Sequence, residues 1–128
     1  MDQLHQCGLP PGWRFRIGTH ILFDASRRSL WHASCPDRQF SLELAHAAAL
    51  EKLLQRPRTV LRWDQLVSPQ WHAWGLTPDA NGVAQAMHAL RDVFLQLDPA
   101  TAYLHGLPRL GYVLLADVRP EPDKGAGV

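Results

Sequence analysis

The sequence predicts an α+β fold with an N-terminal antiparallel β-sheet, three helices and a C-terminal β-hairpin. One observation is an apolar stripe whose members recur at intervals of four, three, four and three, which places them on one face of a helix. These residues are Val83, Met87, Leu90, Phe94 and Leu97. A second is the turn-forming stretch from Gly106 to Gly111, which leads into the apolar run Tyr112-Val113-Leu114-Leu115 and is typical of a hairpin. A long helix followed closely by a short hairpin indicates a winged helix.

The N-terminal part predicts a leader followed by strands. Residues 1–12 are rich in Gly and Pro and suggest a flexible leader. From Trp13, short apolar runs separated by turn residues predict two or three antiparallel strands near residues 13–17, 21–23 and 30–31. A fourth strand is possible at residues 38–40.

Two helices are predicted next. An Ala- and Leu-rich run after Ser41 predicts a helix with Ser41 as its N-cap and an end near Arg56-Pro57. Residues 59–61 indicate a short strand, and residues 63–67 a second, shorter helix that Ser68-Pro69 stops.

The third helix is expected over residues 79–97. Thr77 or Asp79 can accept the free amide hydrogens at its start, and Asp98-Pro99 ends it. The face opposite the apolar stripe carries four polar side chains, namely Asn81, Gln85, His88 and Asp92. Residues 119–128 indicate a disordered tail or linker, so the domain is expected to span residues 13–118.

Composition sets limits on function. The chain has 128 residues, enough for one domain with its own core. Thirteen Lys and Arg against twelve Asp and Glu give a net charge of +1, so overall charge offers no argument for nucleic acid. No phosphate-binding loop or recognisable nucleophile motif is present, so an enzyme is not expected.

The two cysteines, Cys7 and Cys35, favour free thiols in a reducing compartment, although together with His5 and His32 they leave a zinc site as a remote alternative. No cofactor is expected. No apolar run reaches the roughly 18 residues of a membrane span, and the N-terminus lacks a signal-peptide pattern. The chain is therefore expected to be cytoplasmic.

Three motifs carry a resemblance to a known family. Met87, Leu90 and Arg91 lie near the end of the long helix, and a Pro-Arg-x-Gly-Tyr motif spans residues 108–112. Leu66 and Trp71 keep a characteristic spacing upstream. In these features residues 14–117 resemble the winged helix-turn-helix domain of OmpR/PhoB-type transcription regulators, in particular the CadC/ToxR-like ones.

The resemblance implies a DNA-binding domain of a bacterial transcription regulator, with a recognition helix in the major groove and a wing in the minor groove. Side chains expected to contact DNA are Asn81, Gln85, His88 and Arg91 on the long helix, Arg58 and Arg62 beside the second helix, and Arg109 on the wing. The loop over residues 68–77 is implied to touch RNA polymerase. Within it, Trp71 is expected in the core and Trp74 as an exposed partner-binding aromatic residue.

An alternative remains open because the outer helix face carries Asp92 and no Lys or Arg. The chain could be a degenerate winged helix that acts as a protein-protein interaction module, through Trp74, Leu107 and Leu110. For the DNA-binding hypothesis, dimers on direct or inverted half-sites are expected, because one such module buries little DNA surface, and regulation could come from dimerisation or from a regulatory protein partner.

Overall fold

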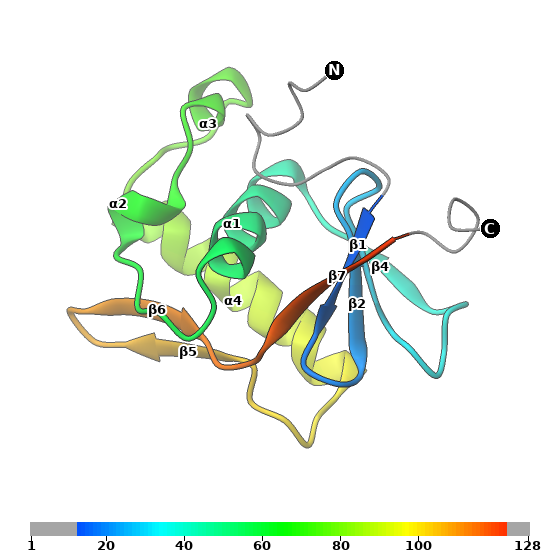
Figure 1. The fold of residues 1–128 in the computed structure, drawn as a ribbon. Coiled ribbons are helices and arrows are strands. Elements are labelled where there is room, and N and C mark those ends of the chain that lie inside the picture. Colours follow the sequence, from blue (N-terminus) through cyan, green and yellow to red (C-terminus); the bar gives the residue numbers. More distant parts are fainter. Residues whose placement is uncertain (1–12, 123–128) are drawn as a thin grey trace.

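The computed structural model describes residues 13–122. Its strands are β1 (Trp13–Ile17), β2 (Ile21–Asp24), β3 (Ser29–His32), β4 (Gln39–Ser41), β5 (Leu104–Leu107), β6 (Gly111–Leu114) and β7 (Val118–Pro122). Its helices are α1 (Leu44–Gln55), α2 (Trp63–Leu66), α3 (Gln70–Ala73) and α4 (Ala80–Leu97). Five of the strands form one sheet, and Figure 1 shows this sheet on one side of α1 and α4, with α2, α3 and the β5–β6 hairpin on the other. The α+β winged-helix prediction is confirmed.

The larger sheet is antiparallel with the order β4-β3-β2-β1-β7. All four strands expected from the N-terminal sequence are present, the possible fourth included. Their apolar side chains turn inward: Ile17, Ile21, Phe23 and Leu30 are fully buried. The sheet thus provides one wall of the core against which the helices pack.

Strand β7 is a departure from the sequence prediction. The expected tail from residue 119 was wrong for residues 119–122, which extend β7 along β1 in the register Arg16↔Arg119 and Arg14↔Glu121. Arg16 and Glu121 form an ion pair across these strands. Two prolines are tolerated because β7 is an edge strand, where a missing amide hydrogen leaves no ladder bond unmade. Residues 1–12, the predicted leader, and 123–128 lie outside the described residues.

Helix α1 begins later than predicted. Ser41 belongs to β4, and Glu43 occupies the N-cap without a side-chain hydrogen bond. Ala45, Ala49, Leu50 and Leu53 form its buried face, where the small alanines allow close approach to α4.

The segment between α1 and α4 differs in two details. The strand expected at residues 59–61 is reduced to a single bridge between Leu61 and Tyr112. The loop expected between the second and third helices contains the one-turn helix α3. Trp71 in α3 is buried, as predicted for a core residue.

Helix α4 matches its prediction closely. Asp79 is the N-cap, and its carboxylate accepts a hydrogen bond from the backbone N–H of Gly82 at 2.8 Å. All five members of the predicted apolar stripe are buried. The helix ends at Asp98, whose N–H donates to the carbonyl of Phe94.

Tyr103 joins three parts of the fold. Its hydroxyl donates to Asp98 Oδ2 at 2.6 Å, and its ring stacks on Phe94 with the centroids 5.0 Å apart. Its carbonyl accepts from the N–H of Leu115, after β6. A Cβ added to Gly18, in the β1–β2 turn, would lie 3.2 Å from its ring. One residue therefore links the end of α4, the hairpin and the larger sheet.

No helix within residues 13–122 combines the length and apolarity that crossing a bilayer requires.

Tyr103→Phe should lower stability in a pH-dependent way. The hydrogen bond from Tyr103 lowers the pKa of Asp98 from 3.8, while burial, followed by the same hydrogen bond, raises the pKa of Tyr103. The Asp98 contribution is present above the unfolded-state pKa near 3.8 and is lost as pH falls through the lower folded-state pKa. We expect a loss of about 1.5–3 kcal/mol at pH 7, the range for hydrogen bonds to charged groups, and a flatter decline below pH 4.

Urea unfolding between pH 2.5 and 7 measures this effect. Tyr112→Phe, at the other described tyrosine, is the control. Parallel pH profiles for wild type and Tyr103→Phe would contradict the role given to this hydrogen bond.

Candidate nucleic-acid interface

The outer face of α4 is polar and open. Asn81, Gln85, His88 and Asp92 are all exposed, and at 100° per residue they fall within one sector opposite the buried stripe. Asp92 is the charged member of this set, with no Lys or Arg beside it on the face. The face can offer amide and imidazole hydrogen bonds but little positive charge.

The β5–β6 hairpin closes with a tight four-residue turn. The N–H of Leu110 donates to the carbonyl of Leu107 at 3.0 Å, with Pro108 second and Arg109 third in the turn. Arg109 has φ +67°, the conformation that a type II turn requires at its third position and that usually selects Gly. The side chain of Arg109 therefore lies at the tip of the wing on a backbone conformation that non-glycine residues rarely adopt.

Gly111 fixes how the hairpin meets the α1–α2 connection. Its φ is +142°, and an added Cβ would lie 2.1 Å from the carbonyl oxygen of Leu61. This close approach allows Leu61 and Tyr112 to exchange two backbone hydrogen bonds of 2.8 Å. The start of α2 is thereby held against the hairpin.

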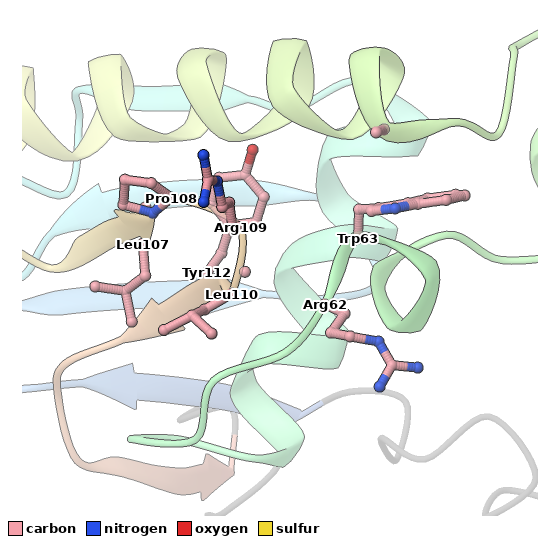
Figure 2. A pocket seen from close by; sticks show the side chains of 10 residues that line it. Arg62, Trp63, Leu107, Pro108, Arg109, Leu110 and Tyr112 are labelled. Atoms are coloured by element: carbon pink, nitrogen blue, oxygen red, sulfur yellow. The ribbon is translucent and has the colours of Figure 1, made fainter.

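A groove of about 580 Å³ runs between the hairpin, the start of α2 and the start of α4. It is lined by Arg62 and Trp63 from the α2 end, Ala80 from α4, and residues 106–112 from the hairpin. In the view of Figure 2, Arg109 extends from the turn towards α4, whereas Leu107 and Leu110 point to the other side. The wing thus has a cationic side next to α4 and an apolar side away from it.

Arg91 lies on the edge of α4 that faces the hairpin. It is half-buried, and a Cβ on Gly106 would be 3.4 Å from its Nη2 atom. Gly106 also lines the groove that contains Arg62 and Arg109. The structure therefore gathers Arg62, Arg91 and Arg109 around one hairpin.

Two of the predicted DNA contacts are engaged with carboxylates. Arg62 pairs with both oxygens of Asp64 at 3.1 and 3.0 Å, and this pairing lowers the pKa of Asp64. Arg58 pairs with Asp117 at 3.1 Å and lines a separate hollow at the root of the hairpin. Among the described residues, Arg91 and Arg109 have no ion-pair partner.

The aromatic residues differ from expectation. Trp74 was expected to be exposed, but it caps α3 and packs partly buried against the core. Trp63 is the more open, with 40% of its surface exposed at the edge of the groove. In the sequence, only its position at the start of a short helix, where few neighbours can cover a side chain, pointed to the exposure of Trp63.

The structure gives no support for a zinc site within residues 13–122, where no three His, Cys, Asp or Glu side chains gather as metal ligands. His5 and Cys7, half of the alternative zinc set, lie outside that part.

No protein-family model and no curated protein matches the sequence. Solved structures do match the fold. The DNA-binding domain of E. coli CadC aligns over 83% of this chain and 94% of its own, with 24% identity and a TM-score of 0.65. The C-terminal domain of NsrR, a lantibiotic response regulator, aligns over 76% and 93%, with 21% identity and a TM-score of 0.59.

A third structure is the DNA-binding domain of Klebsiella pneumoniae RstA in complex with the RstA box. It aligns over 80% of this chain and 96% of its own, with 17% identity and a TM-score of 0.58. The three neighbours confirm the winged-helix fold that the sequence motifs predicted.

Gly111→Ala should detach the hairpin from the α1–α2 connection, because the new methyl group would collide with the Leu61 carbonyl. We expect a loss of about 2 kcal/mol or more in unfolding free energy. Faster amide hydrogen exchange at Leu61 and Tyr112 would report the local opening.

Gly75→Ala is the matched control. Gly75 also has a positive φ, +76°, but nothing lies within 4 Å of an added Cβ, so only the backbone strain of about 1 kcal/mol is expected. Equal losses in the two variants would show that the contact with Leu61 is unimportant.

Proposed function

Building on the OmpR/PhoB-type winged-helix fold, we propose that this chain is the DNA-binding domain of a bacterial transcription regulator. Helix α4 enters the major groove, and the β5–β6 wing contacts the minor groove. The three structural neighbours named as DNA-binding or response-regulator domains support the proposal at the level of the fold. The residues around α4 and the wing supply the chemistry.

The outer face of α4 is suited to reading bases. Asn81 and Gln85 carry side-chain amides, which pair well with the N6 and N7 atoms of adenine. His88 lies on the same exposed sector and can donate to a base or a phosphate. Their exposure leaves the face available to a duplex, whose major groove admits a helix.

The proposal rests mainly on the strained backbone and the exposed guanidinium of Arg109. A non-glycine residue at φ +67° costs on the order of 1 kcal/mol, and such strain concentrates at functional sites. Glycine would relieve it but remove the guanidinium, which is exposed and has no ion-pair partner among the described residues. A free arginine on a wing beside a polar helix face is well suited to a narrow minor groove.

Arg62 and Arg91 are proposed to hold phosphates on either side of the wing. Arg91 is ready to do so, whereas Arg62 must exchange Asp64 for a phosphate oxygen. With few free cations, one copy should bind DNA only modestly and with a marked dependence on salt. We therefore propose that two copies, or a protein partner, act together, and that residues 68–77 remain available to RNA polymerase.

Arg109→Gly should separate binding from folding. Removing the guanidinium costs a minor-groove contact of about 1–3 kcal/mol, so duplex affinity should fall about tenfold. Stability should stay within about 1 kcal/mol, because glycine relieves the positive-φ strain but loses more chain entropy on folding. Fluorescence anisotropy with a duplex selected from genomic fragments, at two salt concentrations, together with thermal unfolding, measures both quantities.

Arg28→Gly is the matched control. Arg28 also has a positive φ, +53°, but lies in the β2–β3 turn, so its loss changes the charge equally without touching the wing. Equal losses of duplex affinity in the two variants would show that Arg109→Gly acts through net charge and not through a contact of the wing. Absence of duplex binding by the wild type at low salt would favour the protein-interaction module instead.

Asp64→Asn should strengthen DNA binding. The variant frees Arg62 to bind a phosphate. Since exposed ion pairs are weak, the affinity for a duplex should rise at most about fivefold, and it should fall more steeply with salt concentration. Asp37→Asn, an exposed residue before β4, makes the same charge change elsewhere. A gain confined to Asp64→Asn is expected in anisotropy titrations, and equal gains would argue against a contact by Arg62.

A further inference from the structure

The root of the hairpin carries a second hollow that the DNA proposal leaves unused. It has a volume of about 510 Å³ and lies between the β1–β2 turn, the α1–α2 connection and the segment from β6 to β7. It shares no lining residue with the groove at the wing tip. The two hollows are therefore separate sites at opposite ends of one hairpin.

Guanidinium, imidazole and hydroxyl groups from separate segments converge there. Arg58 comes from the α1–α2 connection, Arg119 from β7 and His20 from the β1–β2 turn, with Thr19 and Thr101 beside them. Asp117 is the only carboxylate among the lining residues, and it pairs with Arg58. This set of donors suits an anion.

Arg58 is held in place by a strained backbone. Three described non-glycine residues have a positive φ, and all are arginines: Arg28, Arg58 and Arg109. The Nε of Arg28 donates to the Leu42 carbonyl, which gives its side chain a structural task. At Arg58, with φ +59°, the backbone N–H donates to the Leu114 carbonyl at 2.9 Å, while the side chain has only its exposed pair with Asp117 and points into the hollow.

Arg119 is also placed at a cost. It stands directly opposite Arg16 in the β1–β7 ladder, and like charges in that position repel. Glu121 compensates both arginines in part, because the hydrogen bond from Arg16 and, to a lesser extent, the charge of Arg119 lower its pKa, and Arg16 also donates to the Thr19 carbonyl. Arg119 is exposed and has no ion pair with any described residue. An anion in the hollow would add to the partial compensation that Glu121 gives Arg119.

We propose that this hollow binds a small phosphorylated ligand through Arg58 and Arg119. The volume fits a small molecule, and guanidinium groups bind phosphoryl oxygens with paired, charge-assisted hydrogen bonds. The Asp117 carboxylate competes for Arg58 and moves aside when the phosphoryl group arrives. Because Tyr103 lines the same hollow, the ligand touches the residue that joins α4 to the hairpin and stabilises that joint.

A DNA phosphate offers the same chemistry as a free ligand. The hollow is assigned to a free ligand because it is separate from the wing-tip groove. This inference does not depend on DNA binding, and either proposal can fail alone.

The experiment titrates the full chain with inorganic phosphate and follows amide shifts by NMR, with sodium chloride at equal ionic strength as reference. Saturable shifts at Arg58 and Arg119 are expected. Arg58→Gln and Arg119→Gln should each weaken binding about tenfold or more, because each removes a charge-assisted hydrogen bond. Asp117→Asn should tighten binding up to about fivefold, because it removes a weak exposed competitor.

Arg27→Gln, at an exposed arginine in the β2–β3 turn, is the charge control and should leave phosphate binding unchanged. Shifts no larger than those with chloride, or equal weakening by Arg27→Gln, would overturn the site. The proposal also falls if phosphate does not bind and Arg58→Gln weakens duplex binding as much as Arg109→Gly, since Arg58 would then serve DNA.

Discussion

The hydrogen bond from Tyr103 to Asp98 joins the end of α4 to the start of the β5–β6 hairpin. Asp98 ends α4, and Tyr103 leads into β5, so their contact sets where the helix stops relative to the wing. The stack of Tyr103 on Phe94 fixes the same junction from the core side. This junction and the two hydrogen bonds between Leu61 and Tyr112 together hold the hairpin beside α4.

The arginines near α4 and the hairpin differ in whether a carboxylate neutralises them. Arg62 and Arg58 are each paired with a nearby carboxylate, whereas Arg91 and Arg109 have no such partner among the described residues. A chain with a net charge of only +1 can still present local cations, provided that the backbone holds them in position. The positive φ of Arg58 and Arg109 shows the backbone doing so at both ends of the hairpin.

Sequence reasoning was most successful where the governing contacts are local. The stripe on α4 and the Asp79 cap depend on periodicity and on one side chain near its own backbone, and both are confirmed. Strand β7 was missed because its prolines suggest a tail, and only pairing with β1, about 100 residues away, makes it a strand. Ser41 was misassigned as a cap because its β-strand pairing with Ser29 outweighs its capping tendency.

The candidate site was partly accessible from sequence. The exposure of Asn81, Gln85 and His88 follows from helical spacing and agrees with the structure. The Arg62–Asp64 pair could have been noticed from its spacing of two residues at a helix start. The location of Arg58 could not, because a left-handed backbone conformation directs it to Asp117, far along the chain.

The pairing of β7 with β1 sets Trp13 opposite Pro122, so the described chain starts and finishes at the same end of the larger sheet. Figure 1 shows that end on the far side of the molecule from the hairpin tip. A tether attached at either end would therefore pull along two neighbouring antiparallel strands, and the force would pass into the sheet before it reached α4. An attachment at either end of the described chain would thus lie away from the tip of the wing.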